Sequence, residues 1–141
     1  MSVPGDRVGA SATYTPLVLE HFRHPRNSGA LPAPTASHEG VNPLCGDRIR
    51  VEIAVDGDHI TAARFRADAC AVTVAAASLL TERVTGESLA TVAALTEDDA
   101  LALIGAELPP ARRRCGTLPL EVLQGAVREA GTGGDAGRGT R

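Results

Sequence analysis

Two periodicities of apolar side chains divide the first half of the chain. Residues 14–22 carry large or apolar side chains at positions i, i+3, i+4, i+7 and i+8, which predicts an amphipathic helix. Residues 48–55 alternate between polar and apolar side chains, as a half-buried strand does. Asp56-Gly57 is a hairpin-turn signal, so residues 59–68 are expected to return as a second strand. At most a short edge strand fits near residues 36–40, within a proline-rich stretch.

A helical period replaces the strand period after residue 70. The apolar spacing predicts a long helix that ends near Gly86, followed by a short helix that begins at Ser88. Thr96 begins another helix, because Asp99 follows it at the spacing of a capping box. A last helix is expected over residues 117–129. The second half of the chain is therefore predicted to be helical.

The order of these elements predicts one α+β domain with two layers. A small, three-stranded antiparallel sheet would carry the helices on one face, because each amphipathic helix must bury its apolar side. We expect residues 13–130 to form this domain. Residues 1–12 and 131–141 are rich in glycine, small polar residues and charge, and are expected to be disordered tails.

The composition of the chain argues against two broad classes of partner. The 141 residues carry a net charge of −3, with one tyrosine, two phenylalanines and no tryptophan, so there is neither a basic field nor an aromatic surface for nucleic acid. No apolar run reaches the roughly 18 residues that a membrane span needs. The first residues also lack the apolar stretch of a secretory signal, so we expect a cytoplasmic protein.

The three cysteines lie at the boundaries of predicted elements. Cys45 is in a turn before the first clear strand, Cys70 is where the hairpin ends and the long helix begins, and Cys115 precedes the last helix. An odd number of cysteines in a reducing compartment argues against a disulfide framework. Buried, incidental thiols are the alternative, but none of the three lies inside an apolar periodic run. Their placement favours metal binding or thiol chemistry.

The neighbouring residues suggest how such a site would be built. A helix N-terminus favours negative charge, so the pKa values of Cys70 and Cys115 are expected to be lowered. Arg112 and Arg114, close to Cys115 in the sequence, would act in the same direction. Three thiolates and the carboxylate of Asp47 would complete a tetrahedral site for zinc or for an iron of a cluster.

Four segments of the chain carry motifs of one known family. They are Tyr14 with His21 and Pro25-Arg26-Asn27-x-Gly29, then Asn42-Pro43-Leu44-Cys45-Gly46-Asp47, then Phe65-x4-Cys70-Ala71-Val72-Thr73 with Ser78, and finally Arg112-Arg113-Arg114-Cys115-Gly116-Thr117-Leu118. In this order, over about residues 14–130, the chain resembles the iron–sulfur cluster assembly scaffolds of the IscU, SufU and NifU N-terminal type. The second segment is similar to the SufU form of the first ligand motif.

The resemblance implies a function in sulfur handling. A scaffold or carrier of this family accepts persulfide sulfur from a cysteine desulfurase and holds metal or a nascent [2Fe-2S] cluster for a downstream acceptor protein. The alternative is a zinc-dependent sulfurtransferase partner of the desulfurase that never builds a cluster. In the first case the protein is a carrier, and only in the second would it count as an enzyme. A small protein with a purely structural zinc site is a third possibility, but it would not need a labile carboxylate ligand.

Departures from the family pattern bear on this choice. Arg114 stands where IscU-type members usually have a histidine, which favours the SufU type and zinc. SufU-type members usually carry an extra segment between the second and third cysteines, and the 45 positions from Cys70 to Cys115 leave little room for it. Residues 108–112 differ at two positions from the chaperone-recognition motif of IscU types, so chaperone handling is not carried over.

Two cysteines are candidates for the persulfide acceptor. Cys45 lies in a turn that contains Gly46 and is bounded by Pro43, and this turn is expected to have few packing restraints. SufU-type resemblance also points to Cys45, whereas IscU-type resemblance points to Cys115. We therefore expect Cys45 to be the acceptor, with Cys115 as the second candidate.

Overall fold

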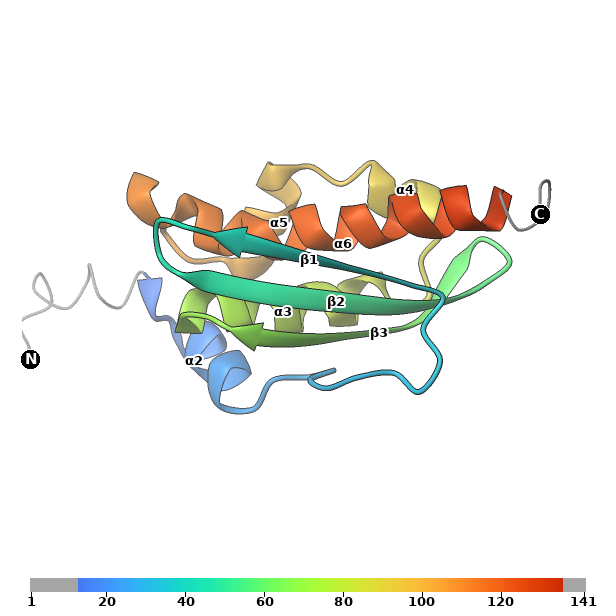
Figure 1. Cartoon of the computed structure of the whole chain (residues 1–141). Helices are drawn as coiled ribbons and strands as arrows, with labels where there is room; N and C mark the ends of the chain where they lie inside the picture. Colours follow the sequence, from blue (N-terminus) through green and yellow to red (C-terminus); the bar gives the residue numbers. More distant parts are fainter. Residues whose placement is uncertain (1–12, 136–141) are drawn as a thin grey trace, which may run out of the picture.

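The computed structural model describes residues 13–135, which form a sheet covered by helices (Figure 1). In chain order the elements are α2 (Pro16–Arg23), β1 (Ala36–Asn42), β2 (Asp47–Asp56), β3 (His59–Asp68), α3 (Ala71–Val84), α4 (Leu89–Ala93), α5 (Glu97–Ile104), the 3-10 helix η1 (Pro110–Arg112) and α6 (Arg113–Asp135). In this part of the chain, no helix combines the length and the apolar character that crossing a membrane requires.

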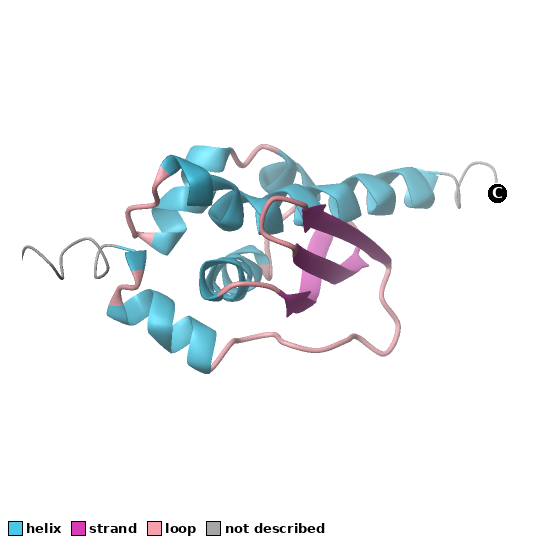
Figure 2. Ribbon diagram, turned by 60° about the vertical axis from the view of Figure 1, so that its left-hand side comes forward, coloured by secondary structure: helices cyan, strands magenta, loops and turns pink. Residues whose placement is uncertain are grey.

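The three strands form one antiparallel sheet in the order β1-β2-β3. Alternate side chains of the central strand β2 are fully buried, among them those of Ile49, Val51 and Ile53 at 0–1% exposure. These side chains pack on the helices gathered on one side of the sheet (Figure 2). The predicted α+β architecture and the hairpin of residues 48–68 are confirmed. The edge strand β1 runs two residues beyond its expected end, to Asn42.

Two helices cover the inner face of the sheet. Helix α6 contacts β1 and β2, and α3 contacts β3, while α2 packs against α3 rather than against the sheet. Helix α6 comes very close to β1 at Gly40, where an added Cβ would lie 2.5 Å from the side chain of Val122. Strand β1 is therefore held against α6 along a surface that leaves no room for a larger residue at this point.

The predicted start of the last helix is wrong by four residues. Residues 117–129 would have placed Pro119 in the first turn, but α6 begins at Arg113 and encloses Pro119. Packing explains the earlier start, because an added Cβ on Gly116 would lie 2.8 Å from the side chains of both Ile104 and Leu108. These tertiary contacts hold the first turn helical in spite of the proline.

The predicted tails have different outcomes. Residues 131–135, which the sequence assigns to a disordered tail, continue α6 in the structure. Residues 1–12 and 136–141 lie outside the described part of the chain.

Truncation of a buried side chain in α6 tests this arrangement. Leu123 is 0% exposed in the cluster between α6 and the sheet, so Leu123→Ala should lower the free energy of unfolding by about 2–5 kcal/mol. Leu17→Ala, at a side chain that is 44% exposed, is the matched control and should lower it much less. Urea denaturation of both variants measures the difference. Equal losses would contradict the packing described for α6.

Candidate metal centre

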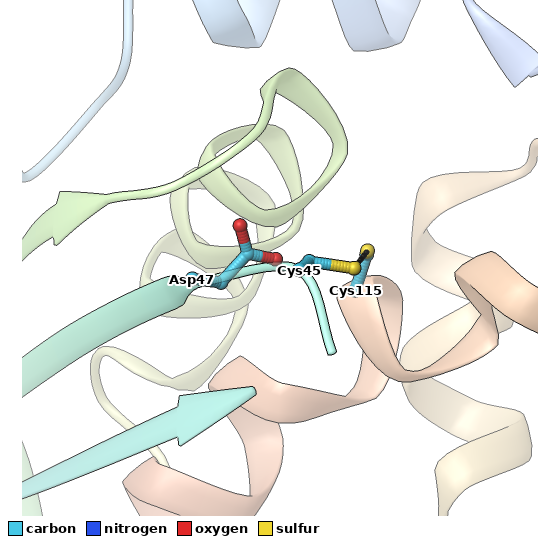
Figure 3. A group of neighbouring side chains, drawn as sticks. All are labelled: Cys45, Asp47 and Cys115. Carbon is cyan, nitrogen blue, oxygen red and sulfur yellow. Dashed lines mark hydrogen bonds between the residues drawn. The ribbon is translucent and has the colours of Figure 1, made fainter. Parts of the chain in front are cut away.

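The segments that carry the three cysteines and Asp47 meet at one end of the molecule. The turn between β1 and β2, the junction of β3 with α3 and the first turn of α6 all lie at the left-hand end in Figure 1. There Cys45, Asp47 and Cys115 each offer one ligand atom, and these atoms all lie within 4.8 Å of one another (Figure 3). Residues separated by about seventy positions in the sequence are thus brought into one cluster.

Asn42 fixes the turn that carries Cys45. Its backbone oxygen accepts hydrogen bonds from the N–H groups of Cys45 (3.1 Å) and Gly46 (2.8 Å). Its side-chain oxygen accepts from Leu44 N, while its amide nitrogen lies 3.6 Å from Cys45 Sγ. Gly46 has a φ of +73°, a conformation that favours glycine. The turn has few packing contacts, as the sequence predicts, since Leu44 is 90% exposed and Cys45 is exposed, but hydrogen bonds within the turn fix its backbone.

Asp47 reaches from the first residue of β2 to the N-terminus of α3. It is 3% exposed, and each carboxylate oxygen accepts a hydrogen bond. Oδ1 accepts from the backbone N–H of Cys70 at 3.1 Å, and Oδ2 accepts from the hydroxyl of Thr73 at 3.0 Å. Oδ2 is also a weak acceptor for the Cys70 thiol at 3.8 Å, while Oδ1 keeps a second lone-pair direction, so the carboxylate remains able to bind a metal.

Cys70 lies beside the cluster and not inside it. It is the N-cap residue of α3, as the sequence predicts, and its Sγ is 3.8 Å from Asp47 Oδ2 and 3.5 Å from Thr73 Oγ1. It does not belong to the group whose ligand atoms all lie within 4.8 Å. The fourth predicted ligand therefore contacts Asp47 and neighbours Cys115, but it lies outside the group itself.

Cys115 has the opposite electrostatic character from the one expected. It lies in the first turn of α6 rather than before the helix, and it is 1% exposed. Burial, with a smaller contribution from the neighbouring Cys70 and Cys45, raises the pKa of the Cys115 thiol to about 12. The cost of removing a thiolate from water therefore exceeds what the helix N-terminus contributes.

Of the two arginines predicted to support the site, only Arg112 lies against the thiols. Its Nη1 atom is buried without a hydrogen-bond partner, and its guanidinium lies 5.6 Å from the ring centre of Tyr14. Burial would lower the pKa of Arg112, but Tyr14 and the thiols of Cys70 and Cys115 raise it. Arg114 instead pairs with Glu121 at 3.1 Å. Arg112 thus provides a fixed positive charge beside the cluster.

The geometry of the donor atoms fits a tetrahedral metal. Two thiolates bound to one zinc at about 2.3 Å lie roughly 3.8 Å apart, and the Sγ atoms of Cys45 and Cys115 are 3.9 Å apart. A set of thiolates with one carboxylate also suits zinc or an iron of a cluster, and Arg112 would offset part of its negative charge. No histidine belongs to the group that the described residues form. The Nδ1 atom of His21 contacts Ser78 Oγ at 2.7 Å instead.

From the sequence, Asn42 and Thr73 are recognised only as parts of family motifs, and neither of them is assigned a role at the site. The role of Asn42 could have been predicted, because an asparagine two residues before an N–H group commonly forms a turn with its own side chain. Thr73 gives no such signal. A threonine in the first turn of a helix is ordinary, and only the fold places its hydroxyl against a carboxylate from β2.

Comparisons with known proteins agree with this fold. The family model described as NifU-like N terminal domain matches residues 13–130. The zinc-dependent sulfurtransferase SufU of Bacillus subtilis is 31% identical, with 84% of this chain and 92% of the relative covered. The iron-sulfur cluster assembly scaffold protein IscU of Aquifex aeolicus is 36% identical, with 84% and 76% covered. The chain spans only 24% of the bifunctional protein NifU/MnmA of Rubrobacter xylanophilus, to which it is 36% identical.

Solved structures show the same fold. The N-terminal part of a NifU-like protein from Brucella abortus superposes with a TM-score of 0.73 at 19% identity, covering 87% of this chain and 97% of that one. A SufU-type scaffold protein from Fervidobacterium islandicum gives a TM-score of 0.70 at 21% identity, covering 84% and 99%.

The raised pKa of Cys115 predicts that metal binding releases protons. The pKa of about 12 keeps this thiol protonated at pH 7, whereas a metal binds the thiolate. Zinc and the proton therefore compete, and the zinc affinity of the protein should rise with pH over the neutral range. Calorimetry in two buffers with different ionisation enthalpies measures the released protons. Binding without proton release would show that Cys115 is not a ligand.

Proposed function

The chain belongs to the family of NifU-like N-terminal domains, the iron–sulfur cluster scaffolds of the IscU, SufU and NifU type, and from this membership we propose that it is a sulfur carrier and cluster scaffold. It accepts persulfide sulfur from a cysteine desulfurase. It holds metal or a nascent [2Fe-2S] cluster at Cys45, Asp47, Cys70 and Cys115, and passes the product to an acceptor protein. Three free thiols require a reducing compartment, so we propose a cytoplasmic location.

The observation that carries this proposal is the cluster at the end of the sheet. Cys45 and Asp47 come from the turn before β2 and the start of that strand, Cys115 comes from α6, and their ligand atoms lie within 4.8 Å of one another. A structural zinc site would close all four positions with tightly held ligands. Here one thiol is exposed and one ligand is a carboxylate, so the site suits a protein that must release what it holds.

One observation favours the alternative function, a zinc-dependent sulfurtransferase partner of the desulfurase. The Bacillus relative with that name is covered over 92% of its length. However, its alignment extends over 136 positions and uses only 84% of this 141-residue chain, so the relative has positions that this chain lacks. The scaffold named IscU shares the higher identity, 36% against 31%. We therefore keep the scaffold as the leading function.

Exposure supports Cys45 as the persulfide acceptor. The thiol of Cys45 is exposed, whereas that of Cys115 is 1% exposed and out of reach of a second protein. The thiolate of Cys45 would attack the terminal sulfur of the persulfide on the desulfurase. The bond between the two persulfide sulfurs breaks, the desulfurase cysteine leaves as a thiolate, and Cys45 keeps the transferred sulfur.

Removal of each thiol separates the two candidates. Cys45→Ser should abolish persulfide formation after incubation with a cysteine desulfurase and cysteine, because the nucleophile is lost. Cys115→Ser should leave a persulfide on Cys45 and mainly weaken metal binding. Mass spectrometry of the intact and digested protein locates the extra sulfur. A persulfide found on Cys115 alone would reverse the assignment.

Asp47→Ala distinguishes the scaffold from the zinc protein. Carboxylate oxygen is a harder ligand than thiolate, so it is the weakest bond to an iron–sulfur centre. The variant should therefore hold a reconstituted cluster that passes more slowly to an acceptor. In a zinc protein the same change removes a fourth ligand and should weaken zinc binding. After anaerobic reconstitution with iron and sulfide, cluster transfer to an acceptor protein measures the first quantity, and a zinc titration measures the second. If neither quantity changes, Asp47 is not a ligand.

A further inference from the structure

A buried threonine in α3 faces the proposed metal centre. Thr73 is 0% exposed, and its hydroxyl donates a hydrogen bond to Asp47 Oδ2 at 3.0 Å. The hydroxyl oxygen of Thr73 also lies 3.5 Å from Cys70 Sγ. One hydroxyl group thus contacts two of the four residues assigned to the site, and it comes from a different element than the carboxylate that it binds.

The other threonines of this region show that the contact is not the usual one. The hydroxyl of Thr81, in the same helix and 1% exposed, donates to the carbonyl oxygen of Ala77, one turn earlier. The hydroxyl of Thr85 donates in the same way to Thr81. Threonines in helices commonly bond to a carbonyl of the preceding turn. Thr73 instead directs its hydrogen across the interior to β2.

We propose that Thr73 is a positioning residue that holds the carboxylate of Asp47 in the orientation in which it binds metal, an inference that rests on the proposed function of the site. Two donors fix the carboxylate, the Cys70 N–H on Oδ1 and the Thr73 hydroxyl on Oδ2. In Figure 3 the carboxylate has one oxygen directed toward the sulfurs of Cys45 and Cys115. The S–H of Cys70 is a third, weak donor to Oδ2 at 3.8 Å. Once Cys70 is a thiolate that donor is lost, so without the Thr73 hydroxyl a single hydrogen bond remains and the carboxylate can rotate about it.

The expected effect follows from how outer residues support metal ligands. Removing a hydrogen-bond partner of a ligand typically lowers metal affinity by roughly 10- to 100-fold. Thr73→Val keeps the shape of the side chain and removes the hydroxyl, so it should weaken zinc binding by about this factor. Thr73→Ser keeps the hydroxyl and should restore the affinity. The measurement is a zinc titration in competition with a chromophoric chelator.

Thr81→Val is the matched control. It removes an equally buried hydroxyl from the same helix, one that does not contact Asp47 or a cysteine in the described structure. It should lower the melting temperature of the protein about as much as Thr73→Val does, with the zinc affinity unchanged. A loss of affinity in both variants would show that helix stability, and not the position of Asp47, controls the site, and the proposal would be wrong.

A double substitution tests whether Thr73 acts through Asp47. In the Asp47→Ala background, Thr73→Val should cause no further loss of zinc affinity, because no carboxylate remains to be positioned. The same further loss in both backgrounds would overturn the proposal. If the parent binds zinc and Asp47→Ala weakens it while Thr73→Val does not, the role of Thr73 alone is wrong. If the parent protein binds no zinc and assembles no cluster, the proposed function fails, and the inference with it.

Discussion

The carboxylate of Asp47 joins the two layers of the molecule at the point where the site is formed. Asp47 is the first residue of β2. Its carboxylate accepts hydrogen bonds from the backbone N–H of Cys70 and the hydroxyl of Thr73, both at the beginning of α3. Cys70 occupies the N-cap of this helix but makes no capping bond with its own side chain. Asp47 supplies a carboxylate to the helix N-terminus instead. The contact that joins the sheet to α3 therefore also orients the carboxylate that we propose as a metal ligand.

Burial sets the chemistry of the thiols once this connection is made. The most deeply buried one, Cys115, is a poor thiolate in the absence of metal because ionised sulfur would lose its water. The positive charge of Arg112, whose Nη1 atom is buried, lies close by, yet the pKa of Cys115 stays raised. A bound metal ion would supply the missing positive charge, so an empty site would favour protons and a loaded site would favour thiolates. Cys45 is exposed and is not subject to the same burial.

Sequence patterns predict those parts of the structure that local rules determine. The alternation in β2, the hairpin at Asp56-Gly57 and the capping box of Thr96 with Asp99 are found as expected. The sequence predicts that Cys45, Asp47, Cys70 and Cys115 converge, from the family motifs and the position of the cysteines at element boundaries. The structure groups three of them and leaves Cys70 beside the group. The start of α6 and the raised pKa of Cys115 were not predictable, since both depend on burial by segments distant in the sequence. The hydrogen bond from the Thr73 hydroxyl to Asp47 was not predictable either, because it joins two elements that only the fold brings together.

Pro119 interrupts the backbone hydrogen bonds of α6. In an α-helix the N–H of residue 119 would donate to the carbonyl of Cys115, and proline has no N–H. The turn that contains Cys115 is therefore joined to the rest of α6 by one backbone hydrogen bond fewer than in an uninterrupted helix. Tertiary packing compensates for the missing bond, because an added Cβ on Gly116 in that turn would lie 2.8 Å from the side chains of both Ile104 and Leu108. The position of the Cys115 sulfur therefore depends on the end of α5 and the segment before η1 as well as on α6 itself.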